Sequence, residues 1–151
     1  MQLSYDGTNY HGWQNQPNAI TVQSCVENAL KTILKTKIPI YAAGRTDSGV
    51  HAIHMCVHFD FIYELDFNKI IHDLNSFLPY DISINNIFKV NDNFHARFDA
   101  ISREYKYVIS VKKNVFDYNK AYILFKDLDL SLIHISEPTR PRLISYAVFC
   151  L

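Results

Sequence analysis

The chain has 151 residues, of which 48% are hydrophobic and 20% are charged. This apolar share excludes a disordered or low-complexity chain, because it is large enough to bury a core. The 15 basic and 15 acidic residues give a formal net charge of zero, so the overall charge offers no argument for a nucleic-acid partner.

The first part of the chain predicts a strand, a polar loop and an amphipathic helix. Met1 to Tyr5 is typical of a short strand, and the Asp, Gly and Asn residues that follow favour a turn. From Val22 to Ile33 apolar residues recur at helical spacing, with Thr21 as the expected N-cap. Pro39 prevents this helix from continuing past Ile38.

The middle of the chain predicts two strands followed by a second helix. Ile38 to Ala43 and Val50 to Phe61 are apolar and partly β-branched, which favours strands. A loop bracketed by Gly44 and Gly49 separates them. Asp66 is the expected N-cap of an amphipathic helix that ends before Pro79.

Two further strands are predicted beyond the second helix. Ile82 to Val90 alternates well enough for a strand, and Phe94 to Ala100 is expected to be irregular. Arg103 to Val111 alternates polar and apolar residues most clearly. Two helices against a mainly antiparallel sheet predict an α+β fold.

The last segment, from residue 131 to residue 151, differs from the rest. It contains Pro138 and Pro141, has no sustained period, and ends in apolar residues. It resembles the peptide produced when sequencing-adapter DNA is translated at the end of a truncated reading frame. We therefore expect this tail to be non-native, with a terminal strand from Leu143 to Phe149 as the alternative.

A candidate catalytic group lies in the glycine-bracketed loop between the two predicted middle strands. Asp47 stands two residues after Arg45, and a nearby positive charge favours an ionised carboxylate, which can act as a nucleophile or base. The glycines would let a substrate approach the backbone. The alternative is a turn in which Asp47 bonds its own backbone.

Aromatic and basic residues elsewhere suit a nucleic-acid ligand. Tyr10 and Trp13 on the first loop could stack on unpaired bases, or they could be core residues at the edge of a loop. From Arg97 to Lys113, five basic residues accompany two acidic ones. This surplus fits phosphate contacts, and it equally fits a solvated strand face.

A group of metal-ligand residue types follows the candidate catalytic loop. His51, His54, Cys56 and His58 have the side chains that bind zinc. On a strand, however, His51 would point away from the other three, and no second ligand cluster exists to close a site. We therefore predict that no metal binds here.

Four segments carry a combined signal that no single one provides. They are Tyr5-Asp6-Gly7, Tyr10 and Gly12-Trp13-Gln14; Gly44-Arg45-Thr46-Asp47 and Gly49-Val50-His51-Ala52; Phe94-His95-Ala96-Arg97-Phe98; and Arg103, Tyr105 and Tyr107. In this order they resemble the motifs of the tRNA pseudouridine synthase A (TruA) family. The resemblance implies a ferredoxin-like antiparallel sheet with two helices on one face. It also implies isomerisation of uridine to pseudouridine in the anticodon stem-loop of tRNA, without cofactor or metal.

The resemblance also implies roles for individual residues. Asp47 matches the catalytic aspartate, Tyr105 matches the tyrosine that lies against the target base, and Arg45 matches the basic residue of the catalytic loop. Arg45 is expected to pair with Asp47 or to occupy the space that the base vacates. How Asp47 acts stays open among attack on the sugar, attack on the base and assistance to a glycal-forming elimination.

The resemblance covers only the N-terminal half of the family's length, from Met1 to about Leu130. Residues 1–130 are therefore expected to form an N-terminal catalytic subdomain, and the full-length family implies a homodimer. Two alternatives stay open, a non-catalytic RNA-binding module and a gene fragment without function. Aggregation of the chain on expression would favour the second of these.

The cellular compartment is inferred from what the chain lacks. No stretch approaches the ~20 apolar residues that a membrane span needs, and the first residues have neither the basic region nor the apolar run of a signal peptide. Cys25, Cys56 and Cys150 are widely spaced, which favours free thiols in a reducing compartment. We expect a cytoplasmic protein.

Overall fold

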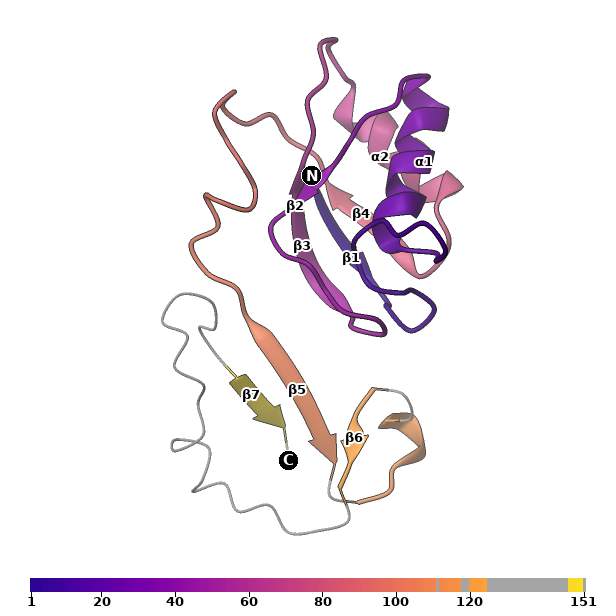
Figure 1. Ribbon diagram of the computed structural model, residues 1–151, viewed down its shortest axis with the longest axis vertical. Coiled ribbons are helices and arrows are strands. Elements are labelled where there is room, and N and C mark those ends of the chain that lie inside the picture. Colours follow the sequence, from indigo (N-terminus) through magenta and orange to yellow (C-terminus); the bar gives the residue numbers. More distant parts are fainter. Residues whose placement is uncertain (111, 118–119, 125–146, 151) are drawn as a thin grey trace. The chain divides into compact units, whose positions relative to one another are not determined.

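A computed structural model describes residues 1–110, 112–117, 120–124 and 147–150, the last four by their backbone alone. The chain forms two compact units, Met1–Ala100 and Ile101–Leu151 (Figure 1). None of the helices in these ranges is long and apolar enough to cross a membrane.

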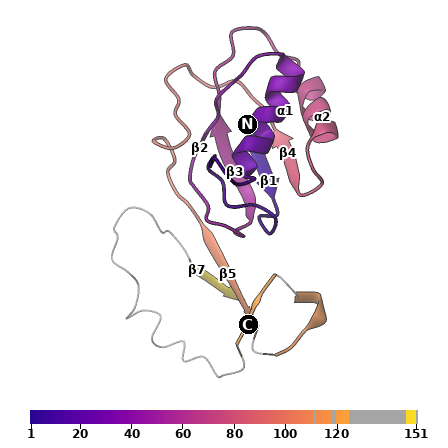
Figure 2. The same cartoon turned by 45° about the vertical axis from the view of Figure 1, so that its right-hand side comes forward.

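The first unit is built on a four-stranded sheet. Its strands are β1 (Gln2–Tyr5), β2 (Tyr41–Ala42), β3 (Ala52–His58) and β4 (Ile82–Asn86), in the order β2-β3-β1-β4. Every neighbouring pair is antiparallel. Helices α1 (Val22–Leu34) and α2 (Phe67–Phe77) lie on the same face of the sheet, as both ribbon views show (Figures 1 and 2). The predicted α+β, ferredoxin-like fold is confirmed.

Helix α1 begins at the predicted cap. The Thr21 hydroxyl accepts a hydrogen bond from the Ser24 backbone N–H at 3.3 Å, and the Ser24 hydroxyl accepts one from the Thr21 N–H at 3.2 Å. This reciprocal capping box satisfies two backbone donors that the first turn leaves unpaired. The helix ends at Leu34 rather than near Pro39, because Lys35 adopts the left-handed conformation with φ of 55°.

Helix α2 also begins at its predicted cap and is fastened to the neighbouring strand. The Asp66 carboxylate accepts a hydrogen bond from the Lys69 N–H at 3.2 Å. The helix ends where Leu78 becomes extended, as expected for a residue that precedes a proline. The Asn75 side chain then bonds both the N–H and the carbonyl of Ile84 in β4, at 2.7 and 2.9 Å.

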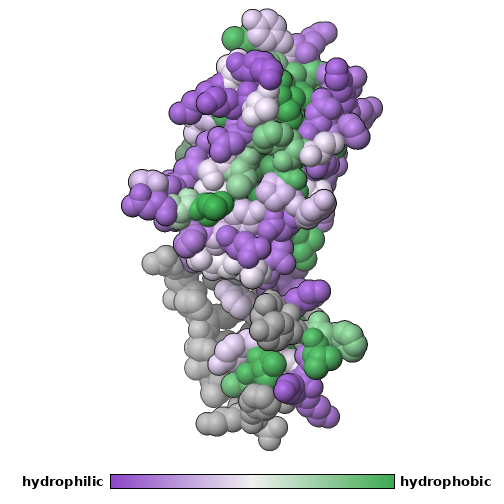
Figure 3. Space-filling model, turned by 90° about the vertical axis from the view of Figure 1, so that its right-hand side faces the viewer, coloured by the Kyte–Doolittle hydropathy of each residue, from purple (hydrophilic) through white to green (hydrophobic). Residues whose placement is uncertain are grey.

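The core lies between the helices and one face of the sheet. Alternate residues of the strands point toward the helices and most of them are buried, whereas the residues between them are more exposed, as the two-residue period of a strand requires. The inward residues of β1, β3 and β4 are Leu3, Tyr5, Met55, Val57, Ile82 and Ile84. They pack against Val22, Val26, Ala29 and Leu30 of α1 and Ile70 and Leu74 of α2. Figure 3 shows this unit from the side on which both helices lie, with hydrophilic residues covering much of the surface.

Three of the predicted strands are shorter in the structure. Ile38–Ala43 pairs only over β2, Val50–Phe61 only over β3, and Ile82–Val90 only over β4. The central strand β1 has four residues, from Gln2 opposite Cys56 and Asn86 to Tyr5 opposite Ala52 and Ile82. Its neighbours gain no ladder hydrogen bonds from β1 beyond these residues, and β3 continues to Val57 and His58 by pairing with β2.

The second unit contains a three-stranded sheet in the order β6-β5-β7 with parallel pairs. Its strands are β5 (Tyr105–Ser110), β6 (Tyr122–Ile123) and β7 (Ala147–Cys150), and a short 3-10 helix, η1 (Val115–Asp117), lies between β5 and β6. The predicted strand from Arg103 to Val111 corresponds to β5, whereas η1 and β6 were not predicted. The predicted boundary at residue 130 and most of the 131–151 tail fall outside the described residues.

Candidate active site

Asp47 lies on the loop that connects β2 to β3, and its side chain is exposed to solvent. Its backbone carbonyl accepts a hydrogen bond from the Val50 N–H at 3.2 Å, which closes a tight turn. Within the described part of the chain, its carboxylate accepts no hydrogen bond and forms no ion pair. The turn role considered from the sequence, in which the carboxylate bonds its own backbone, is therefore not what the structure contains.

Backbone hydrogen bonds connect the Asp47 loop to the first loop of the chain, which comprises residues 6–21 between β1 and α1. The Trp13 N–H donates to the Thr46 carbonyl at 3.0 Å, and the Gly49 N–H donates to the Tyr10 carbonyl at 3.2 Å. The Ser48 hydroxyl donates to the same Tyr10 carbonyl at 3.2 Å. These bonds hold the residues on both sides of Asp47 while its side chain faces solvent.

Two glycines permit this close contact between the loops. A Cβ atom placed on Gly7 would lie 2.0 Å from the Val50 carbonyl oxygen, and one on Gly12 would lie 2.5 Å from the Thr46 carbonyl oxygen. Gly12 also has a φ of 82°, which other residues rarely adopt. The glycines of the first loop are therefore required by the approach of the Asp47 loop.

The aromatic residues of the first loop are core residues rather than exposed stacking surfaces. Trp13 and Tyr10 are 2% and 5% exposed. The Trp13 ring lies 6.0 Å from the ring of Tyr5, whose hydroxyl shares a hydrogen bond of 2.8 Å with the Thr46 hydroxyl. The core interpretation of these aromatics is thus correct, and the cluster contacts the Asp47 loop through the bond between Tyr5 and Thr46.

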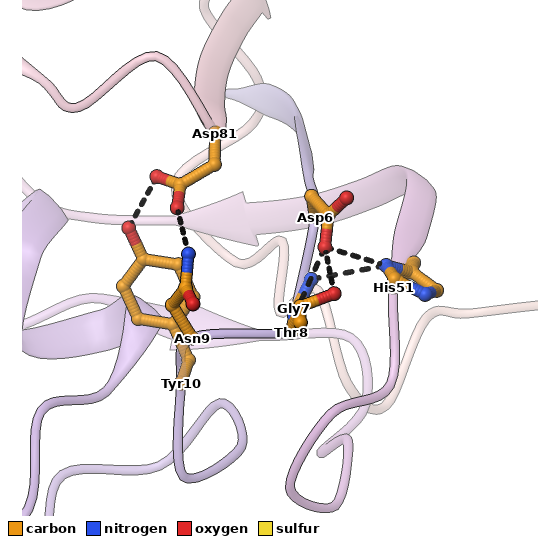
Figure 4. Close-up of polar contacts among 7 residues, drawn as sticks. All are labelled: Asp6, Gly7, Thr8, Asn9, Tyr10, His51 and Asp81. Carbon is orange, nitrogen blue, oxygen red and sulfur yellow. Dashed lines mark hydrogen bonds and ion pairs between the residues drawn. The ribbon is translucent and has the colours of Figure 1, made fainter. Parts of the chain in front are cut away.

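The carboxylate of Asp81, between α2 and β4, holds the first loop from the opposite side (Figure 4). It accepts hydrogen bonds from the Tyr10 hydroxyl and, at 3.3 Å, from the side-chain amide of Asn9. Burial raises the pKa of Tyr10 well above its usual value, and the bond to Asp81 raises it further. The hydroxyl therefore stays protonated and is the donor in its hydrogen bond to Asp81. The sequence did not indicate Asp81, because it belongs to no motif.

Asp6 and His51 join the start of the first loop to the end of the Asp47 loop. The Asp6 carboxylate lies 3.0 Å from Nδ1 of His51, and the Gly7 N–H points to the same nitrogen at 3.2 Å (Figure 4). One protonation state of Nδ1 does not satisfy both contacts, because the Gly7 N–H needs an acceptor there and an ion pair with Asp6 needs a proton. Hydrogen bonds from Thr8 lower the pKa of Asp6, with a smaller contribution from His51.

The other two residues with predicted roles take no part in the contacts described above. The Arg45 side chain is exposed, and the described residues include no ion pair between Arg45 and Asp47. Tyr105 begins β5 in the second unit, and 37% of its surface is exposed. The substrate-binding roles of Arg45 and Tyr105 stay predictions.

His58, the last residue of β3, belongs to an aromatic cluster. The His58 ring stacks on Tyr41 at 5.1 Å and lies 4.5 Å from the ring of His95. Nδ1 of His58 accepts a hydrogen bond from the Ala96 N–H at 3.1 Å, and burial lowers the pKa of this histidine. Among the residues that the structure describes, no group of three or more His, Cys, Asp or Glu is arranged to hold a metal ion.

Comparison with known proteins identifies relatives over most of the chain. A family model described as tRNA pseudouridine synthase matches residues 2–99. A Bacteroides fragilis protein named tRNA pseudouridine synthase A is 45% identical over 148 residues, which cover 92% of this chain and 59% of the relative. A protein of the same name from Bacteroides thetaiotaomicron is 42% identical over 149 residues, covering 99% of this chain and 55% of its own length. The chain thus spans a little over half the length of these curated relatives.

Proposed function

The chain belongs to the tRNA pseudouridine synthase family, and on that basis we propose that it takes part in the isomerisation of uridine to pseudouridine in the anticodon stem-loop of tRNA. The observation that carries the proposal is the placement of Asp47. Its carboxylate is exposed and makes no hydrogen bond within the described residues, on a loop whose backbone is held at both sides.

The reaction explains why a carboxylate in this setting is useful. The N1–C1′ bond of the nucleotide breaks, the uracil turns, and C5 bonds to C1′, after which the proton leaves C5 and N1 carries a proton in its place. Attack on C1′, attack on the uracil ring and a glycal-forming elimination all need an ionised carboxylate next to the nucleotide. Asp47 supplies this group whichever route is taken.

The substrate must reach Asp47 outside the RNA helix. A base inside a stem is stacked and paired, so the enzyme turns the nucleotide outward at a cost of about a few kcal/mol. An exposed carboxylate on a surface loop is accessible to such a nucleotide, whereas a buried one is not. In this proposal Tyr105 stacks against the detached uracil, and Arg45 pairs with Asp47 or fills the space that the base leaves.

The proposal extends to the assembly and its surroundings. Its partner is tRNA, no cofactor or metal takes part in the chemistry, and the active assembly is a homodimer in the cytoplasm. Residues 1–130 supply the catalytic subdomain, and residues 131–151 are a non-native tail. Sedimentation velocity of the purified chain, with and without tRNA, measures the assembly directly.

The proposed function is tested by tritium release from tRNA transcribed with uridine labelled at C5. We expect release with the unchanged protein and at least a 1,000-fold loss with Asp47→Asn, an order of magnitude typical of removing a nucleophile or base. Filter binding of the same tRNA should change less than about threefold, because the substitution removes one surface charge.

A matched control uses a second exposed aspartate of the same unit. Asp92 is exposed and lies on the chain after β4, so Asp92→Asn removes the same charge without touching the Asp47 loop. Release by this variant should equal that of the unchanged protein. Equal release by Asp47→Asn would overturn the proposal, and binding without release by the unchanged protein would favour a non-catalytic RNA-binding module.

A further inference from the structure

We propose that Asp81 is a positioning residue for Asp47, acting through Tyr10 and the backbone of the Asp47 loop. The inference rests on the proposed function, because it assigns a role in placing the same carboxylate. Hydrogen bonds at the two ends of Tyr10 connect Asp81 to Ser48 and Gly49, the two residues that follow Asp47 in the chain.

The first link joins Asp81 to the first loop at three points. Its two carboxylate oxygens accept from the Tyr10 hydroxyl and the Asn9 amide (Figure 4). Its backbone carbonyl accepts from the Asp6 N–H at 2.8 Å. Figure 4 shows Asn9 and Tyr10 turned toward Asp81, whereas the Asp6 carboxylate contacts Thr8 and His51. A single aspartate thus fixes both the start and the middle of this loop.

The second link joins Tyr10 to the Asp47 loop. The Tyr10 carbonyl is the common acceptor for the Ser48 hydroxyl and the Gly49 N–H, both at 3.2 Å. These two residues directly follow Asp47 in the sequence. A shift of the Tyr10 backbone therefore moves the turn that carries the catalytic carboxylate.

The bond between Tyr10 and Asp81 is placed to resist such a shift. Tyr10 is 5% exposed, so water competes poorly for its hydroxyl, and a hydrogen bond to a charged acceptor is stronger than a neutral one. Without Asp81 the buried hydroxyl loses its acceptor, and the ring must move to find another. Catalysis is sensitive to such movements, since a displacement of about 1 Å can cost about 100-fold in rate.

The connection from Asp81 through Tyr10 to the Asp47 loop is called the relay, and two variants break it at different points. Tyr10→Phe removes the hydroxyl and keeps the ring, whereas Asp81→Ala removes the acceptor. We expect each to lower kcat for tritium release by about 10- to 100-fold while KM for tRNA changes less than about twofold, because the substrate contacts neither residue in this proposal. The double variant should be no slower than the worse single variant, since both remove one shared interaction.

Two further variants separate positioning from a general structural role. Asp81→Asn retains an oxygen that accepts from the Tyr10 hydroxyl, so it should recover at least half of the unchanged kcat. Asp73→Asn is the matched control on α2. Asp73 makes no side-chain hydrogen bond within the described part of the chain, and its substitution should leave kcat unchanged.

Amide hydrogen exchange gives a readout that does not depend on activity. In Tyr10→Phe and Asp81→Ala we expect the Gly49 amide to exchange about tenfold faster, the effect of weakening one hydrogen bond by about 1.4 kcal/mol. The Leu30 amide of α1 should keep its rate. Equal acceleration at both amides would mean global destabilisation and would overturn the inference.

The remaining outcomes separate the relay from the proposed function. If Asp47→Asn abolishes release while Tyr10→Phe and Asp81→Ala leave kcat and Gly49 exchange unchanged, the function stands and the relay is wrong. If the unchanged protein releases no tritium, the proposed function fails, and a role for Asp81 in positioning a catalytic group fails with it. Accelerated Gly49 exchange would then establish only a structural contact.

Discussion

At the scale of single residues, Gly7 is a severe steric constraint on the candidate site. A Cβ at this position would lie 2.0 Å from the Val50 carbonyl oxygen, which is a backbone atom and cannot rotate away. The first loop and the Asp47 loop would have to separate. We expect Gly7→Ala to lower the free energy of unfolding by about 3 kcal/mol, the upper part of the range for overpacking, and to abolish tritium release.

A second glycine separates this steric cost from conformational strain. Gly49 has a φ of 79°, but a Cβ placed there meets no atom within 4 Å. Gly49→Ala should therefore cost about 1 kcal/mol, the strain of a left-handed residue. Urea denaturation of both variants measures the two costs, and a Gly7→Ala protein as stable as Gly49→Ala would contradict the packing described here.

Residues differ in how well a sequence can reveal their roles. Thr21 and Asp66 could be predicted as helix caps because capping is a local property. The compact motif around Asp47 indicates a catalytic role, which stays a prediction. Asp81 could not be predicted, since its bond to Tyr10 spans 71 positions and leaves no periodic signal. The burial of Trp13 could not be predicted from the sequence either, because an aromatic residue on a loop suits both a core and a stacking surface.

At the scale of elements, the shortness of β1 and β2 limits how much of the neighbouring chain becomes strand. The apolar runs on either side of β3 and after β4 satisfy strand propensity, but they have no partner beyond the four residues of β1 and the two of β2. Within the first unit, propensity therefore predicted the existence of the strands and their order along the chain correctly, and it overestimated the lengths of three of them. Strand ends depend on pairing between distant segments, which a local pattern does not contain.

Helix α1 provides a prediction at this scale, because its start depends on one buried side chain. Thr21 is fully buried, its hydroxyl caps the Ser24 N–H, and the same hydroxyl donates to the Asn15 side chain at 3.1 Å. Thr21→Ala should lower the free energy of unfolding by about 1 to 2 kcal/mol, as for other lost N-caps. Thr21→Ser retains the hydroxyl and should recover most of this loss in the same urea titration. Equal losses in both variants would show that the methyl group matters rather than the cap.

At the scale of the whole molecule, the first unit holds a core of its own. The cluster of buried hydrophobic residues runs from Met1 to Ile87 in the sequence, within the unit that ends at Ala100. The family match over residues 2–99 covers nearly the same range. The candidate catalytic loop and the relay from Asp81 both lie inside this unit, so their geometry depends on its core.

Removal of residues 131–151 tests how far that core is independent. We expect the shortened chain to keep the free energy of unfolding of the first unit to within about 0.5 kcal/mol, the usual effect of changes outside a core. Trp13 is the only tryptophan of the chain and is 2% exposed, so its fluorescence reports on this unit alone.

A second truncation after Ala100 should give the same transition midpoint, because every residue of the buried cluster is retained. A lower midpoint in the first truncation would show that the tail stabilises the unit, which contradicts its interpretation as non-native sequence. A lower midpoint in the second truncation alone would instead place part of the stabilising contacts between residues 101 and 130.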